Sequence, residues 1–201
     1  MLRSCASIAV TAAAIVVGAQ LALGAVGCTL NDPDRDILRV FPEATDYETD
    51  FLTVAEAGGD SLAAEIEARL GDALDPLYET TDVPYAYYSV LGPGGELLGR
   101  VHGVNQRGTY GGMQIILATD PHGAIVDFYY QKLSSPEAAA FRDEAFRSQF
   151  RGLSLDDFAH GGSDADTTGG EGPGTVASIT DPTEKSAVDF EATLRGIHKD
   201  L

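Results

Sequence analysis

The stretch that decides the fold is "YAYYSVLGPGGELLGRVHGVNQRGTYGGMQIILATDPHGAIVDFYYQ", residues 85–131. Within it, "YAYYSV" and "LLGRVHGV" flank the turn sequence "GPGGE", while "MQIILAT" and "AIVDFYY" flank "DPHG". Gly and Pro therefore stand where tight turns between strands need them. We expect two hairpins that join into one meandering antiparallel sheet.

The segments around this stretch have the periodicity of helices. Apolar residues recur at helical spacing near 61–74, 136–150 and 183–198, and Ser135 and Pro136 suit the N-cap and first position of the second helix. A further strand is expected near 47–54, and "VASI", residues 176–179, has the composition of a short edge strand. Helices segregated around one antiparallel sheet predict an α+β fold.

Composition limits the function. The length of 201 residues suits one domain. The formal net charge of −18 repels nucleic acid. Both cysteines, Cys5 and Cys28, lie near the N-terminus, and the four histidines lack ligand spacing. We therefore expect no metal site and no nucleic-acid partner.

Residues 1–28 are typical of an export segment. Arg3 is followed by an uncharged apolar run, and "LALGAVGC" ends at Cys28 in a sequence that resembles the lipobox of bacterial lipoproteins. A lipidated Cys28, an uncleaved anchor helix and a cleaved secretion signal are all compatible with the run. Each alternative predicts an extracytoplasmic domain, and the first two predict membrane anchoring.

The rest of the chain divides into a tether and a domain. Residues 29–36, "TLNDPDRD", are polar and are expected to link the membrane segment to a domain spanning 37–201. Within that domain, 159–175 belong to a Gly- and Asp-rich stretch without periodicity, which predicts a mobile loop.

The segment "SITDPTEKSAVDF", residues 178–190, has two interpretations. Asp181 as N-cap, Pro182 at the first helical position and Glu184 three residues after the cap predict an ordinary helix start. Alternatively, the free amides and positive dipole end of such a helix make the Thr183 hydroxyl a favourable point for attaching a phosphate.

From residue 41 onward the chain resembles the extracytoplasmic FMN-binding domain family, found in the C subunit of sodium-translocating NADH:quinone reductase and the G subunit of the Rnf complex. The resemblance rests on "GGMQIILATDPHGAIVDFYYQ", on "LSSPEAAAFRDEAFRSQFRGLSLDDF" and on "SITDPTEKSAVDF". It implies an FMN-binding-domain-like fold, with FMN joined by a flavin transferase through its phosphate to Thr183.

The same resemblance implies that Thr180 matches the first hydroxyl residue of the attachment motif, and that Ser135 and Pro136 lie across a groove from Thr183. Departures from the family are also present. Asp181 and Pro182 replace the family's Gly and Ala, Ser134 stands where it has Glu, and Glu137 where it has Gly. The attachment motif is therefore degenerate.

Two weaker candidates have simpler explanations. "VNQRGTYGG", residues 104–112, could cradle a phosphate but lacks phosphate-loop spacing, which favours a connection between strands. Six tyrosines could stack on a flavin, although aromatic residues in strands more often pack within the sheet: Tyr85, Tyr87, Tyr88, Tyr110, Tyr129 and Tyr130.

Two functions follow from this sequence. The first is a membrane-tethered extracytoplasmic flavoprotein that takes part in electron transfer with a redox partner protein, as a component rather than a stand-alone catalyst. The second is a cofactor-free envelope lipoprotein that keeps the FMN-binding fold as an interaction module. The retained Thr183 favours the first, and the "DPTE" substitution favours the second.

Overall fold

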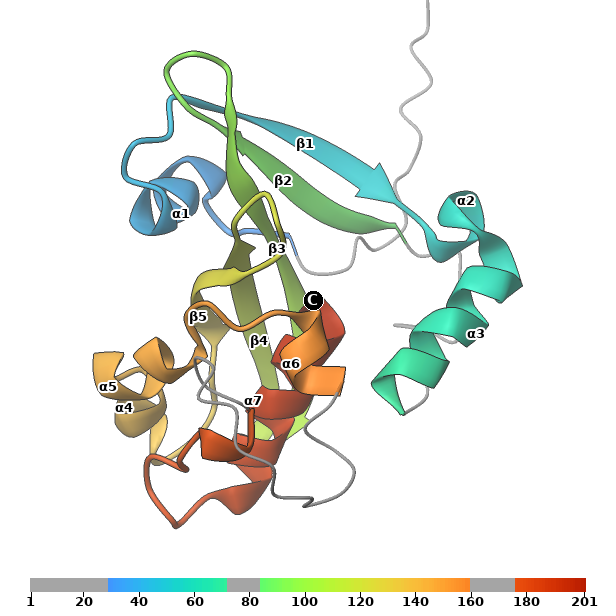
Figure 1. Cartoon of the computed structure of the whole chain (residues 1–201). Helices are drawn as coiled ribbons and strands as arrows, with labels where there is room; N and C mark the ends of the chain where they lie inside the picture. The colour runs from blue at the N-terminus through green and yellow to red at the C-terminus, as the bar shows by residue number, and fades with distance from the viewer. Residues whose placement is uncertain (1–28, 72–83, 160–175) are drawn as a thin grey trace, which may run out of the picture.

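The computed structural model describes residues 29–71, 84–159 and 176–201 (Figure 1). At its centre is one antiparallel sheet of five strands in the order β1-β2-β3-β4-β5. The strands are β1 (Asp46–Leu52), β2 (Tyr85–Leu91), β3 (Leu97–Gly108), β4 (Gly111–Thr119) and β5 (Ile125–Lys132). The expected meander and both expected hairpins are confirmed.

The turns explain why the chain reverses where it does. Gly95 and Gly123 adopt left-handed backbone angles, with φ of 78° and 86°, in the β2–β3 and β4–β5 turns. In the second turn the Asp120 carboxylate accepts hydrogen bonds from the amides of His122 and Ala124. Between β3 and β4 only Thr109 and Tyr110 intervene, so the Gly-rich segment is a connection between strands, as its simpler explanation predicted.

Helices cover both faces of this sheet (Figure 1). The elements are α1 (Pro33–Val40), α2 (Val54–Ala57), α3 (Gly59–Leu70), α4 (Ala138–Phe141), α5 (Glu144–Arg147), the 3-10 turn η1 (Ser148–Phe150), α6 (Leu155–Ala159), the 3-10 turn η2 (Val176–Ser178) and α7 (Ala187–Asp200). The α+β class is confirmed.

The main core lies between β4, β5 and the helices α4, α5 and α7. Phe128 contacts Phe150 edge to face, with ring centroids 4.9 Å apart, and Phe146 contacts Phe141 in the same way at 5.5 Å. Such edge-to-face pairs add to the stabilisation that burial alone provides. Helix α7 packs against β3 and β4. Close approach is possible because Gly196, which faces Ile115, has no side chain.

The opposite face of the sheet is covered by α1, which changes the expected domain boundary. Leu30, Ile37 and Phe41 are buried against Val101 and Tyr129. The Leu30 amide donates a hydrogen bond to the Tyr88 hydroxyl of β2. Asp36, in the first turn of α1, is buried as well. Residues 29–36 are therefore part of the folded domain rather than a free tether, because Leu30 is buried against the sheet and residues 33–36 form the first turn of α1.

The helix expected over 136–150 is broken into α4, α5 and η1. Asp143 has an extended backbone, and its carboxylate accepts a hydrogen bond from the Ala145 amide, so it starts a new helix where the pattern predicted a continuous one. The break allows both Phe141 and Phe146 to point into the core.

Three other expectations need correction. Residues 176–178 form η2 rather than an edge strand. The helix expected to end near 74 ends at Leu70, and none of its residues is buried. Residues 155–159 form α6, with Phe158 buried, so Ala159, the first residue of the expected mobile loop, belongs to a helix. Residues 160–175, and residues 1–28 with Cys28, lie outside the described residues.

Candidate functional site

The segment around Thr183 is a loop that precedes α7. The helix begins at Ala187 with Ser186 at its N-cap, five residues later than the predicted N-cap Asp181 and first position Pro182. Asp181 does accept hydrogen bonds from the amides of Thr183, at 3.0 Å, and Glu184, at 3.3 Å. Glu184, however, has φ of 55°, a left-handed conformation that ends the turn before it can continue into the helix.

The Thr183 side chain is half-buried and takes part in this loop's own hydrogen bonds. Its Oγ1 accepts from the Lys185 amide at 3.1 Å and lies 3.5 Å from Asp181 Oδ1. The hydroxyl therefore helps to hold the loop closed. It lies at neither of the first two positions of the final helix, so the helix dipole argument for phosphate at Thr183 does not apply directly.

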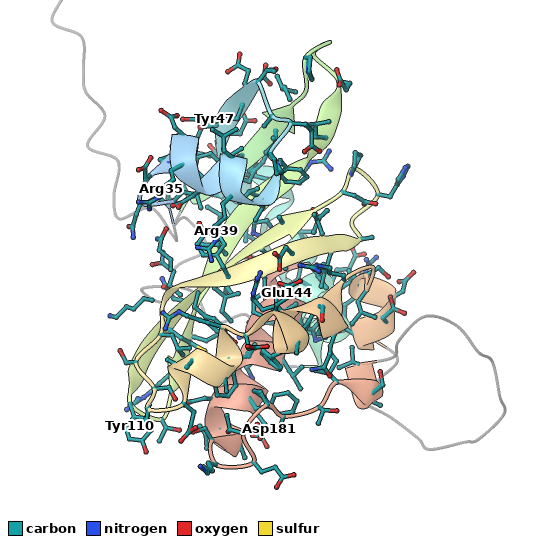
Figure 2. All side chains as sticks on the ribbon, turned by 90° about the vertical axis from the view of Figure 1, so that its left-hand side faces the viewer. Arg35, Arg39, Tyr47, Tyr110, Glu144 and Asp181 are labelled. Carbon is teal, nitrogen blue, oxygen red and sulfur yellow. The ribbon has the colours of Figure 1, made fainter. Side chains whose placement is uncertain are left out.

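A groove of about 460 Å³ runs between this loop and the helices α4 and α5. Thr180 is on its wall, and the Thr180 amide donates a hydrogen bond of 2.8 Å to the side-chain oxygen of Gln149. Figure 2 shows Asp181 on the loop beneath α5, the helix that carries Glu144. The groove walls include Thr180 but not Thr183, Ser135 or Pro136, so the structure does not bring the four expected cofactor-binding residues into one site.

Ser135 and Pro136 have a local role at the start of α4. The Ser135 hydroxyl accepts a hydrogen bond from the Glu137 amide, and the Ala138 amide bonds to the Ser135 carbonyl. Glu137 precedes α4, which begins at Ala138. Both residues thus belong to the turn that leads into the helix.

The groove does not fit a flavin phosphate. The amides of Thr183 and Glu184, which could bind a phosphate oxygen, are already bonded to the Asp181 carboxylate. Asp143 and Asp181 both lie on the groove wall, and no Lys or Arg is among its lining residues. A phosphodiester on Thr183 would place a second negative charge beside Asp181 without a nearby cation in the groove to offset it.

The expected tyrosine surface is divided among different environments. Tyr88, Tyr129 and Tyr130 are buried in the cores. Tyr130 shares a 2.8 Å hydrogen bond with Thr193 of α7, and burial raises the pKa of Tyr130 well above its usual value. Tyr110 is exposed at the tip of the β3–β4 hairpin, where Figure 2 labels it. The buried rings pack within the fold, as the simpler explanation held.

Two buried acids on α7 had no signal in the sequence. Asp189 is fully buried, and one of its carboxylate oxygens accepts a 2.7 Å hydrogen bond from the Thr109 amide, tying the hairpin tip to the helix. At the other end of α7, Asp200 is buried and pairs with Nδ1 of His102 on β3. The partners are 80 and 98 residues apart in sequence, so only the folded chain reveals them.

The His102–Asp200 pair has a perturbed titration. Burial lowers the pKa of His102, but the attraction and hydrogen bond of the Asp200 carboxylate outweigh it, so the His102 pKa lies above its usual value. Burial raises the pKa of Asp200, and His102 offsets this only in part. The folded protein therefore holds protons at this pair more tightly than the unfolded chain does.

The described residues meet the requirements of neither a three-ligand metal site nor a membrane-spanning helix. Across residues 29–71, 84–159 and 176–201, His, Cys, Asp and Glu side chains form no group of three that could bind a metal ion. No helix in these same ranges is both long enough and apolar enough to cross a bilayer.

Comparison with known proteins identifies the fold. The crystal structure of NqrC from Shewanella oneidensis aligns with this chain at a TM-score of 0.50 and 14% sequence identity, covering 85% of this chain and 82% of NqrC. The fold is similar to that of NqrC. No protein-family model matches the sequence, and no curated protein matches it either. The FMN-binding-domain-like fold expected from the sequence is thus confirmed at the level of the fold.

Proposed function

We propose that this chain is an extracytoplasmic, membrane-tethered binding module that keeps the fold of NqrC but carries no covalent flavin. The observation that carries the proposal is the Asp181 carboxylate, which occupies the amides of Thr183 and Glu184. The similarity to NqrC supports the fold, and the groove's two carboxylates argue against a bound phosphate.

The extracytoplasmic and membrane-tethered part of the proposal rests on residues 1–28. Their uncharged apolar run and Cys28 have the pattern of an export and lipidation signal. Cell fractionation of wild type and Cys28→Ala tests it. Wild type is expected in the membrane fraction, and loss of lipidation in Cys28→Ala is expected to release the protein. A wild type found in the cytoplasm would contradict export.

A second candidate function is a flavoprotein that transfers electrons, with FMN attached to Thr183 by a flavin transferase. One observation favours it: the Thr183 side chain retains a hydroxyl and is only half-buried, next to a groove large enough for a small molecule. In this case the flavin would supply the redox chemistry, and the chain would bind and orient it.

Intact mass after co-expression with an active flavin transferase separates the two functions. For the binding module, wild type is expected to keep the unmodified mass. The variant Asp181→Gly with Pro182→Ala removes the carboxylate that holds the loop amides, and Thr183→Val removes the hydroxyl in either background. A mass increase in wild type that Thr183→Val abolishes would establish the flavoprotein instead.

A further inference from the structure

A second pocket shares no lining residue with the groove beside α4 and α5. It is lined by residues of α2 and α3, the helices that follow β1 and stand beside the sheet in Figure 1. Its volume of about 390 Å³ falls in the range of pockets that hold small molecules, about 300–1,000 Å³. Strands β2 and β3, the helices α2 and α3, and the C-terminal end of α7 form its walls.

The greater part of the pocket wall is apolar. Leu62 and Ile66 of α3 face it, together with Leu52 and Val54 and the rings of Tyr85 and Tyr87. Leu62 and Ile66 remain half-buried, and no residue of α3 is fully buried. The apolar side of α3 is therefore directed at a space that the described residues leave partly open, which is costly unless something apolar enters it.

The described lining of the pocket is basic, whereas the protein is acidic. Arg100, His102 and Lys199 line the pocket, and within the part of the chain that the structure describes Asp200 is the one carboxylate in the lining, where it is paired with His102. The chain as a whole has 31 acidic and 13 basic residues. A basic end on an apolar pocket, in a protein this acidic, complements a ligand with an apolar body and one negative group.

We propose that this pocket binds an amphiphilic monocarboxylate, with its apolar chain against Leu62 and Ile66 and its carboxylate toward Arg100 and His102. Asp200 holds the His102 ring through Nδ1, so the imidazole is oriented before the ligand arrives. This inference is independent of the proposed function, because neither Thr183 nor its groove contributes to the pocket.

The test is calorimetric titration of the purified protein with three ten-carbon probes: decanoate, decanol and decyltrimethylammonium. Decanoate is expected to bind more tightly than decanol, and the cation most weakly. Leu62→Asp is expected to weaken decanoate binding at least about ten-fold, since it places a charge in the apolar wall. Arg100→Gln is expected to weaken decanoate about three-fold, as for a partly exposed ion pair, and to leave decanol unchanged.

Arg107→Gln is the matched control. Arg107 is exposed on the same strand as Arg100 but does not line the pocket, so decanoate binding should stay at the wild-type value. Ile66→Asp, with circular dichroism to verify folding, replaces Leu62→Asp if that variant does not fold. Failure of all three probes to bind, or unchanged decanoate affinity in the folded Asp variant, would overturn the proposal.

Two further outcomes also decide against it. Equal affinity for decanoate and the cation would contradict the assignment of the basic end. If wild type is a dimer that Leu62→Asp dissociates and decanoate does not bind, a second copy of the chain occupies the apolar face instead. Sedimentation measured beside the titration distinguishes this case.

Discussion

At the scale of single residues, Gly196 permits the contact between α7 and the sheet. A Cβ at this position would lie 2.6 Å from Ile115 Cδ1 and 2.9 Å from Gln106 Cγ, and Ile115 is fully buried. We expect Gly196→Val to lower the free energy of unfolding by about 2–3 kcal/mol, because overpacking pushes the helix from the sheet.

Urea denaturation measures this effect. The control is Glu191→Val, which adds the same side chain to an exposed position of the same helix and should change stability by only about 0.5 kcal/mol. Equal losses in the two variants would show that the helix does not depend on close approach at Gly196.

The His102–Asp200 pair predicts how stability depends on pH. Both pKa values are raised in the folded state, so the native protein binds more protons than the unfolded chain. The pair therefore stabilises the folded protein at low pH. This stabilisation is lost as the pH rises from about 4, the pKa of Asp in the unfolded chain, through the raised pKa of His102, which lies above about 6.5. Arg100 and Lys199 line the same pocket as the pair.

Denaturation of wild type and of His102→Gln with Asp200→Asn, measured from pH 4 to 9, checks this prediction. The wild type should lose stability relative to the double variant as pH rises. Taking the difference between their free energies of unfolding at each pH removes the general effect of the acidic surface. A difference that is constant with pH, or that grows in favour of wild type, would contradict the assignment.

At the scale of elements, the break between α4 and α5 depends on Asp143. Its carboxylate caps the Ala145 amide, and the break lets the aromatic residues on both sides reach one core. Asp143→Ala should therefore lower the free energy of unfolding by about 1 kcal/mol, the usual effect of removing an N-cap. Asp143→Asn keeps the oxygen acceptor and should cost much less, as thermal denaturation can measure. Similar losses for both substitutions would show that the cap contributes little.

The loop before α7 shows why local pattern and final structure differ. Asp181, Pro182 and Glu184 form a sequence that is well suited to starting a helix. Asp181 does cap the following amides. The backbone of Glu184, however, adopts a left-handed conformation, and α7 starts only at Ala187. From there Asp189 and Thr193 reach the hairpin tip and Tyr130, contacts that fix where the helix lies.

At the scale of the whole molecule, α1 closes one face of the sheet. A chain that begins at Thr29 retains Leu30, Asp36 and the complete helix, whereas one that begins at Ile37 loses them. We expect the shorter chain to have a free energy of unfolding lower by at least about 3 kcal/mol. Removal of Leu30 leaves a cavity beside Tyr88, and the capped first turn of α1 is also lost.

Comparison of the two chains in urea tests the domain boundary. Equal stability would mean that residues 29–36 are a tether after all. The chain that begins at Thr29 serves as the control for removing residues 1–28.

The sequence by itself determined the sheet. Strand periodicity, with Gly and Pro at the turns, is a local signal, and it predicted the β2–β3 and β4–β5 hairpins and the α+β class because neighbouring strands pair through short connections. It also predicted the fold type shared with NqrC, although 14% identity leaves the site residues undetermined.

Tertiary structure alone decided which residues meet. Whether 29–36 would be a tether or a covering helix depended on the burial of Leu30 against a sheet distant in sequence. The pairing of His102 with Asp200 likewise depends on how α7 packs across β3 and β4. Such contacts join positions far apart in the chain, so they leave no spacing or periodicity in the sequence, and their energies arise only once packing has excluded water.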